Sequence, residues 1–552
     1  MIDIVSSNHI RYAPGLSINY PGIVTINNAV FKNADWLGPL NSKNTDKSDY
    51  FSYSTEALPY IMKKQNKVLV LGAGTGDQVE QALNRNAEEI IAVEQDRALT
   101  SLLTEKADEV RFSPYNQKGV NLKSITPRTY LMKSESKFDL IVLPIIGSFG
   151  GSSGLFALQE QYILTKEAFN NMWQRLNDKG IISIITYIDY PYQKPIKILA
   201  TIAEVLQDEG ISELTNYIAA IKNWNTISIA IKKSKISTNE SERIRKFCKK
   251  MNFDPVILPN INAEEQRRYN KLQDETFYMY IAQILSSHKD REKLYSQNAF
   301  NIKPATDDQP YFSQFLQWKS IPQMIELFGT ESVPFFEIGY LLLYITFAQI
   351  VLLAIILIIL PLFKLGWCGG NKVWSLIYFS GLGIGYMFIE IIFIQRFTLY
   401  FGNIVYSAAA VISLMLIASG VGSFVSQRYN AIYRNLMVVI GIIVLLLLIQ
   451  LIFLSPILEL TIGFDLLLKI IFTALLIIPV AFLMGFPFPI GLRLVSHANT
   501  AHVPWAWGIN GSVSVISAVL AAIIAVELGF FWVMVFATTA YSLSLIISFK
   551  RV

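Results

Sequence analysis

The sequence predicts an α/β unit built on a parallel sheet, followed by an all-α unit that spans a membrane. An aliphatic run, Val68 to Leu71, leads directly into three closely spaced glycines. A second aliphatic run, Ile90 to Val93, follows about 20 residues later and ends on a glutamate. From Ile338 onward the chain becomes a series of apolar runs, each long enough to cross a hydrocarbon layer of about 30 Å.

The first motif predicts a strand, a tight turn and a helix that together hold a nucleoside. An unbroken aliphatic run such as Val68 to Leu71 is typical of a buried parallel strand. Gly72, Gly74 and Gly76 permit a tight turn and the close approach of a ligand to the backbone. The helix that follows has a positively polarised N-terminus. Glu94, at the end of the second strand, is placed to accept hydrogen bonds from both hydroxyls of a ribose.

The glycine spacing separates two classes of nucleoside cofactor. Gly72-x-Gly74-x-Gly76 differs from the GxGxxG turn of dinucleotide folds. It resembles the first motif of class I S-adenosylmethionine-dependent methyltransferases, and with Glu94-Gln-Asp96 it resembles the spermidine synthases more narrowly. The resemblance implies a Rossmann-like class I methyltransferase fold and S-adenosylmethionine or decarboxylated S-adenosylmethionine as cofactor. It also implies that Glu94 holds the ribose and that Asp96 lies close by. The alternative is a doubly wound domain whose glycine turn binds nothing.

Composition divides the chain into domains. We expect an N-terminal segment at 1–60, the methyltransferase-like domain at 61–335 and a transmembrane helical domain at 336–552, because 552 residues exceed one ordinary domain. Cys248 and Cys368 fall in different regions, so no disulfide framework is expected. A net charge of +5 without a basic stripe interleaved with aromatics predicts no nucleic-acid partner. We also predict no metal site.

Further elements complete the predicted α/β unit. The pattern predicts a fourth strand at 138–143, a helix at 165–176 ended by a glycine cap at Gly180, a fifth strand at 180–186, and a helix over 262–284. Ligands in open α/β sheets sit outside the carboxyl ends of the strands. That rule points to the glycine-rich loop at 144–154, which is either a lid over the cofactor or a flexible surface loop.

The resemblance is closest to membrane-associated spermidine synthase-like proteins. They share the Gly-Ser-Phe-Gly loop at 147–150 and a later segment that appears here at 305–312 as Ala-Thr-Asp-Asp-Gln-Pro-Tyr-Phe. The paired acids Asp307 and Asp308 have two interpretations, turn chemistry or the binding of an amine or cation.

One departure from the spermidine synthases concerns catalysis. Those enzymes carry an aspartate just after the fourth strand, which orients the attacking amine or accepts its proton. Leu143 and Pro144 occupy that place here. The nearest acids along the chain are Glu160 and Asp189, which we predict as catalytic residues, with solvated surface acids as the alternative.

The membrane part is predicted to contain seven apolar segments. They run roughly over 338–363, 373–395, 402–426, 435–456, 467–492, 509–526 and 530–548. Glu390 stands out because a carboxylate in lipid is costly, so it should face the bundle interior. It either pairs with Arg396 or another cation, or forms a site for a cationic group or a proton. Gly381 and Gly385 allow close helix contact.

These features predict a multi-pass protein of the cell inner membrane. Its function would be that of a membrane-anchored spermidine synthase-like transferase modifying an amine or lipid-like acceptor, with membrane lipids as partners. The alternative is a transporter or sensor whose methyltransferase-like domain only binds a nucleoside or polyamine.

The positive-inside rule and the cofactor chemistry disagree on topology. Lysines and arginines gather in loops on one side of the predicted helices, which would place the first 330 residues outside the cell. Nucleoside cofactors of this type are cytosolic, and no export signal precedes the domain. We expect the soluble domain to be cytoplasmic. A reporter fused to the N-terminus should therefore behave as cytosolic, and accessibility only from outside would contradict the transferase hypothesis.

Overall fold

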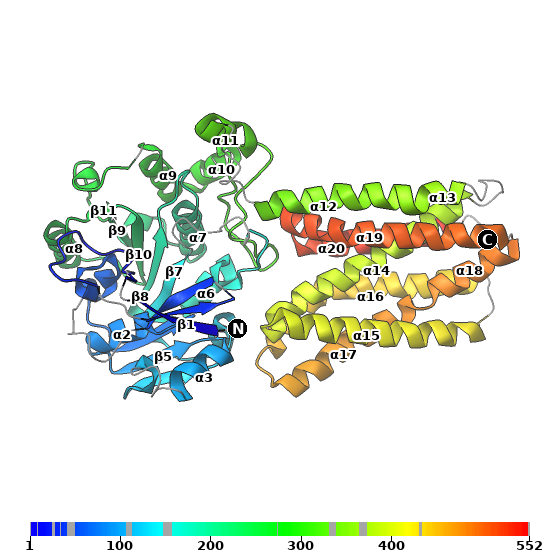
Figure 1. The fold of residues 1–552 in the computed structure, drawn as a ribbon, viewed down its shortest axis with the longest axis horizontal. Helices are drawn as coiled ribbons and strands as arrows, with labels where there is room; N and C mark the ends of the chain where they lie inside the picture. Colours follow the sequence, from blue (N-terminus) through cyan, green and yellow to red (C-terminus); the bar gives the residue numbers. More distant parts are fainter. Residues whose placement is uncertain are drawn as a thin grey trace. The chain divides into compact units, whose positions relative to one another are not determined.

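The chain forms two compact units, Met1–Glu337 and Ile338–Val552, which we treat separately (Figure 1). The computed structural model describes residues 2–549 except 8, 11, 25–27, 34, 41–49, 106–112, 147–156, 273, 330–337, 364–371, 430–432 and 499.

The first unit is built on an eight-stranded sheet with the order β11-β9-β10-β8-β7-β4-β5-β6. The strands are β4 (Lys67–Leu71), β5 (Glu89–Val93), β6 (Val120–Lys123), β7 (Phe138–Ile146), β8 (Leu176–Tyr187), β9 (Ile218–Lys222), β10 (Thr226–Lys232) and β11 (Asp254–Ile257). Strands β6, β5, β4, β7 and β8 are parallel, and β10, β9 and β11 are antiparallel. The predicted fold class is confirmed, because the two aliphatic runs are adjacent parallel strands of this sheet.

Helices cover both faces of this sheet and bury its aliphatic side chains. Helices α1 (Leu58–Met62), α2 (Asp77–Asn84), α3 (Arg97–Glu105) and α8 (Thr238–Met251) share one apolar core with the sheet. The other core contains α5 (Pro127–Lys133), α6 (Lys166–Gln174), α7 (Lys194–Asp208), α9 (Thr276–Leu285) and α10 (His288–Gln297). The result is a three-layer α/β sandwich.

The N-terminal segment adds a small antiparallel sheet in the order β1-β2-β3. Its strands are β1 (Ile2–Ser6), β2 (Asn28–Lys32) and β3 (Asp35–Leu40). Val30 and Leu40 are buried in the same core as α1 and α2. This sheet therefore packs beside the glycine turn, where a Cβ on Gly74 would lie 3.9 Å from the Leu37 carbonyl oxygen.

Two predicted helices differ from the structure. Helix α6 ends at Gln174, because the Arg175 carbonyl already accepts the Phe138 N–H of the sheet, and Gly180 lies inside β8. The predicted helix over 262–284 is interrupted. The Asp254 carboxylate accepts the backbone N–H groups of Tyr269 and Asn270, at 2.8 and 2.6 Å, so α9 begins only at Thr276.

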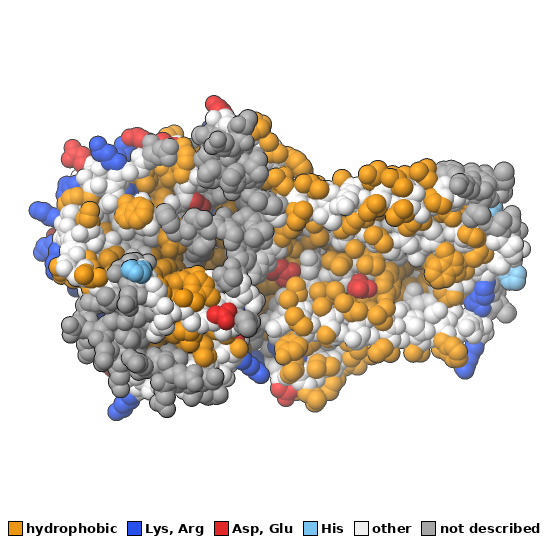
Figure 2. Space-filling model, viewed as in Figure 1, with side chains coloured by type: hydrophobic (Ala, Val, Ile, Leu, Met, Phe, Trp, Pro, Cys, Tyr) orange, Lys and Arg blue, Asp and Glu red, His pale blue; other side chains and the backbone are white. Residues whose placement is uncertain are grey.

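The second unit contains seven helical segments, within its described residues, that are long and apolar enough to cross a membrane. They are formed by α12 (Ile338–Ala354) with α13 (Leu360–Phe363), α14 (Lys372–Phe401), α15 (Ile404–Val425), α16 (Tyr433–Thr461), α17 (Leu466–Met484) with α18 (Pro487–Ala498), α19 (Val503–Leu528) and α20 (Phe530–Phe549). Figure 2 shows hydrophobic side chains over most of its visible side, with Lys and Arg near the end that carries the C-terminus.

Small residues let α14 pack closely against its neighbours. A Cβ on Gly381 would lie 2.7 Å from the Ala540 carbonyl oxygen, and one on Gly385 would lie 2.5 Å from the Tyr541 ring. Both glycines therefore face α20, as the spacing predicted for close helix contact.

A buried ion pair fixes the outer edge of the large sheet, and its loss should destabilise the first unit. Lys222 Nζ lies 3.2 Å from Asp254 Oδ2, and both side chains are fully buried. Asp254→Ala would leave the lysine charge uncompensated, so we expect the free energy of unfolding to fall by about 3–5 kcal/mol. Thermal unfolding of the full chain in detergent, followed by tryptophan emission, measures this.

Glu88→Ala is the matched control for Asp254→Ala. Glu88 pairs with Lys64 at 3.6 Å, and both side chains are exposed. Exposed pairs contribute about 0–1 kcal/mol, so the transition should barely move. Equal shifts for the two variants would contradict the assigned role of the buried pair.

Candidate functional site

The glycine turn at the carboxyl end of β4 has a backbone conformation that favours glycine. Gly72, Gly74 and Gly76 have φ values of +74°, +56° and +100°. The N–H groups of Gly72 and Ala73 donate to the Val93 carbonyl, at 2.8 and 3.0 Å. These bonds hold the turn against the end of β5, and α2 then begins at Asp77.

Glu94 lies beside this turn, with its carboxylate held by two backbone donors. Oε2 accepts the Gly74 N–H at 2.8 Å, and Oε1 accepts the Asp96 N–H at 2.9 Å. A carboxylate offers about four acceptor positions, so about two remain for further donors such as ribose hydroxyls. The side chain of Glu94 is nearly buried, which fixes its orientation.

Tyr115 binds the other backbone polar group of Gly74, which the sequence did not indicate. Its hydroxyl donates to the Gly74 carbonyl at 2.6 Å. Added Cβ atoms at Gly72 and Gly74 would meet little, with nothing within 4 Å of the first and only Leu37 O at 3.9 Å from the second. The turn therefore leaves a space that a bound nucleoside could fill. Gly76 differs, because its Cβ would lie 2.3 Å from Pro114 Cγ.

Asp96 caps α3 and pairs with the N-terminal sheet. Its Oδ1 accepts the Ala98 and Leu99 N–H groups, and its Oδ2 lies 2.6 Å from Lys32 Nζ. Burial alone would raise the pKa of Asp96, but the hydrogen bonds from Lys32 and from the backbone lower it below its usual value. Because Lys32 is the last residue of β2, its ion pair with Asp96 links β2 to the segment that follows Glu94.

A group of acids and tyrosines near the start of α2 was missed by the sequence analysis. Burial and the charges of Glu80 and Glu56 raise the pKa of Asp77 well above its usual value. Burial raises the pKa of Glu56 to about 7, although its Oε2 accepts a 2.7 Å hydrogen bond from Gln78 Nε2. No periodic signal links Glu56 to α2, because the N-terminal segment reaches this place through tertiary contacts.

Two tyrosines belong to this group. Burial and the nearby charges of Tyr187, Asp77 and Glu56 raise the pKa of Tyr12, which also shares a hydrogen bond with Tyr187. Tyr187 is the last residue of β8, at the same sheet edge as the glycine turn. The acidic environment therefore lies on the β8 side of the turn, while Glu94 lies on the β5 side.

The two predicted catalytic acids, Asp189 and Glu160, differ in their hydrogen bonds. Asp189 Oδ1 and Oδ2 accept the Gln193 and Lys194 N–H groups, at 3.0 and 3.1 Å, so Asp189 stabilises the start of α7. Glu160 is half-buried, and its Oε2 is enclosed without a hydrogen-bond partner among the described residues. Burial raises the pKa of Glu160 to about 7, against the effect of a hydrogen bond with Tyr162. Glu160 is thus the acid with a free oxygen.

The paired acids at 307–308 connect distant parts of the first unit. Asp307 Oδ2 lies 2.6 Å from Arg128 Nη2, and Asp307 Oδ1 accepts the Thr165 hydroxyl at 2.6 Å. The Asp307 N–H donates to Glu167 Oε2 at 2.9 Å. Asp307 therefore connects α5 and α6 to the segment at 305–312.

Asp308 and Glu160 both lie near Tyr311. Burial, together with the charges of Glu160 and Asp308, raises the pKa of Tyr311 well above its usual value. Leu143 and Pro144 lie within β7, at the place where spermidine synthases carry an aspartate, and Leu143 is buried. Of the loop predicted as a lid at 144–154, residues 144–146 belong to β7 and residues 147–154 lie outside the described residues.

The two polar residues that the sequence predicts to lie within the membrane, Glu390 and Arg396, are both on α14. Glu390 is half-buried, one turn after Tyr386, whose hydroxyl is 3.4 Å from the Ser419 hydroxyl of α15. The Arg396 guanidinium lies 5.2 Å from the centre of the Phe530 ring. Pairing of Glu390 and a cation or proton site at Glu390 both stay predictions.

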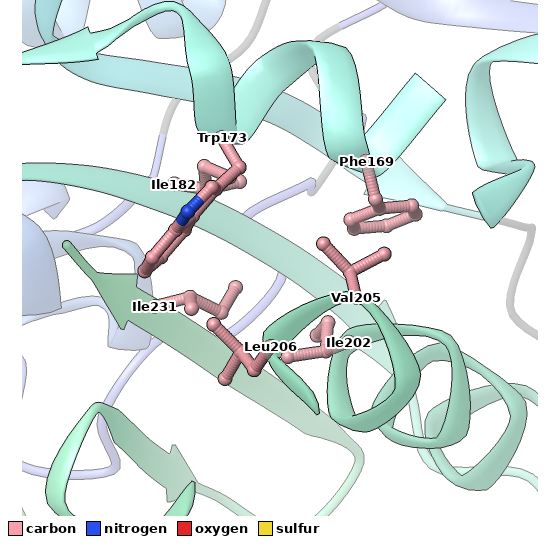
Figure 3. Close-up of a pocket in the computed structure, with 7 residues that line it drawn as sticks. All are labelled: Phe169, Trp173, Ile182, Ile202, Val205, Leu206 and Ile231. Carbon is pink, nitrogen blue, oxygen red and sulfur yellow. The ribbon is translucent and has the colours of Figure 1, made fainter. Parts of the chain in front are cut away.

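A cavity elsewhere in the first unit has no polar lining (Figure 3). It lies among α6, α7, β8 and β10 and is lined by Phe169, Trp173, Ile182, Ile202, Val205, Leu206 and Ile231. Nothing in it could orient a ribose or an amine. Among the described side chains, no group of three or more His, Cys, Asp or Glu is arranged to hold a metal ion.

The sheet order and the glycine turn define a methyltransferase-like unit, and comparison with known proteins agrees. No protein-family model matches the chain. A polyamine aminopropyltransferase of Korarchaeum cryptofilum is 20% identical over 276 residues, which are 48% of this chain and 73% of that protein. One from Thermoplasma volcanium is 25% identical over 154 residues, 27% of this chain and 52% of that protein. The chain thus has weak homology to polyamine aminopropyltransferases.

A solved structure shows the same type of similarity. The spermidine synthase from Thermotoga maritima is 15% identical with a TM-score of 0.30, covering 47% of this chain and 80% of that one.

The geometry of the turn makes a prediction about cofactor binding. Gly74→Val should abolish binding, because its side chain would fill the open space and the residue would need a positive φ. Glu94→Ala should weaken binding by about 1–3 kcal/mol through loss of charge-assisted hydrogen bonds. Calorimetry with S-adenosylmethionine and its decarboxylated form measures both. Unchanged affinity in the two variants would contradict the site.

Proposed function

We propose that the protein transfers a group from S-adenosylmethionine or decarboxylated S-adenosylmethionine to an amine or lipid-like acceptor at the inner membrane, with its first unit in the cytoplasm. The observation that carries this proposal is the Glu94 carboxylate, held 2.8 Å from the Gly74 nitrogen with acceptor positions to spare. Homology to polyamine aminopropyltransferases supports the reaction class, and seven apolar helices support attachment to a membrane.

The distribution of charge favours the decarboxylated cofactor. A nucleoside whose ribose binds Glu94 extends its sulfonium substituents across the glycine turn toward β7 and β8. The acids Asp77 and Glu56 lie on that side of the turn. In their ionised forms they would attract the ammonium group, which both cofactors carry, and would repel the carboxylate, which only S-adenosylmethionine carries.

The acceptor must lose a proton before it attacks. A primary amine has a pKa of about 10 and is mostly protonated at neutral pH. Glu160, whose pKa is raised to about 7, suits a general base, because such a group is poised near the working pH. Leu143 and Pro144 can neither bind a cation nor accept a proton. This replacement supports a larger or membrane-bound acceptor in place of putrescine.

The same replacement favours one second candidate, a sensor or transporter that binds a nucleoside or polyamine without turnover. Such a protein would keep the Glu94 site and would not need a base at Glu160. Formation of a modified product distinguishes the enzyme from the sensor.

Cofactor binding should depend on pH through Glu56. Its pKa is raised to about 7, so between about pH 6 and about pH 8 it becomes charged and attracts an ammonium group more strongly. The stability of the ligand-free fold depends on pH in the opposite direction. Because the pKa of Glu56 is higher in the folded chain than in the unfolded chain, its contribution to stability is fully present below the unfolded pKa. That contribution is lost as the pH rises through about 7.

The measurement is calorimetry with the decarboxylated cofactor at several pH values. Affinity should rise with pH in the natural protein, and Glu56→Gln should remove most of that rise. S-adenosylmethionine is the control ligand, because its carboxylate should cancel the benefit. A pH profile unaffected by Glu56→Gln would contradict the proposed orientation of the cofactor.

The missing aspartate leads to a prediction about turnover. Purified protein given decarboxylated S-adenosylmethionine and putrescine should form little or no spermidine. If a lipid or larger amine is modified instead, Glu160→Gln should slow that reaction by about 10²–10⁴-fold, the usual contribution of a general base. Robust spermidine formation that survives both Glu160→Gln and Asp189→Asn would overturn this argument.

A further inference from the structure

The last described helix before the second unit, α11 (Ser320–Phe328), has apolar residues on opposite sides. One side packs into the first unit. Met324 is buried in the core shared with α6 and α7, and the Ser320 hydroxyl donates to the Ala299 carbonyl at 2.6 Å. These contacts hold α11 against the segment that follows α10.

The outward side of α11 is also apolar. Trp318, just before the helix, and Ile325 are each 53% exposed, and Pro322 between them is exposed as well. At 3.6 residues per turn, Pro322 and Ile325 point away from Ser320. A surface helix of an ordinary soluble domain carries polar residues on the face opposite its core. Here the exposed polar residues, Gln323 and Glu326, lie on one flank only.

The chain itself indicates what covers this face. The first candidate membrane helix begins at Ile338, nine residues after Gly329. Nine residues span at most about 30 Å when fully extended, so α11 cannot leave the vicinity of the bilayer surface. Tryptophan prefers the membrane–water interface, where its ring is in an apolar layer and its N–H remains hydrated.

We propose that Trp318, Pro322 and Ile325 form a membrane-interface anchor that inserts into the boundary between lipid headgroups and acyl chains. The partner is lipid, and the inserted surface is the outward side of α11. The anchor is independent of the proposed transferase activity, because it depends only on the exposed apolar face and its distance from α12. It restricts the first unit to a limited set of orientations at the bilayer.

The test uses the full chain in lipid nanodiscs. Cys248→Ala and Cys368→Ala remove the two natural cysteines, and Ile325→Cys then carries an environment-sensitive fluorophore. Gln323→Cys is the matched control, two residues away on the exposed polar flank of the same helix. Each labelled protein is exposed to lipids brominated near the headgroup and, separately, to aqueous iodide. Unaltered thermal midpoints establish that the variants fold.

The label at position 325 should be quenched by brominated lipid several-fold more than the label at 323, and it should be protected from iodide. Stronger quenching by iodide at 325 would overturn the anchor, because the face would then be in water. Protection from both quenchers would also overturn it, because protein would then cover the face.

Discussion

The hydrogen bond between the Gly74 N–H and Glu94 is the contact on which the site depends. It joins the glycine turn after β4 to the end of the neighbouring strand β5. It also fixes a carboxylate at the carboxyl ends of the parallel strands, where ligands bind in open α/β sheets. Tyr115 donates to the carbonyl of the same residue, so both backbone polar groups of Gly74 have partners before any ligand binds. A site arranged in advance loses less conformational entropy on binding. The glycine at this position is required for the turn and for the space beside it.

The large sheet and the position of Glu94 beside the glycine turn could be predicted because their signals are local. Unbroken aliphatic runs define β4 and β5, and parallel pairing places Glu94 beside the turn. The acids on the other side could not be found this way. Glu56 comes from a segment before the large sheet, and tertiary packing brings it close to Asp77. The interruption of the predicted helix near Asn270 is a similar case. The acceptor that takes the Asn270 N–H is Asp254, which lies in β11, outside the segment that was predicted to be helical.

The candidate site residues also differ in how far the sequence could predict them. Residues that recognise a nucleoside follow a motif, whereas residues that activate an acceptor vary with the acceptor. Asp189 looked equivalent to Glu160 along the chain, yet its two oxygens are occupied by the start of α7. Glu160 has an enclosed oxygen without a hydrogen bond because the segment at 308–311 lies against it. Only the arrangement of these segments distinguishes the two acids.

The attachment of Asp307 to Arg128 and Thr165 has a consequence for biosynthesis. The segment that closes the α/β unit over α5 and α6 is among the last parts of that unit to be made, and α12 follows soon after. Domains fold as units from the N-terminus during synthesis. The unit therefore lacks these contacts until the first long apolar helix is about to emerge. Completion of the α/β unit and the emergence of that helix become nearly simultaneous events, so a delay in one would leave the other exposed to misassembly.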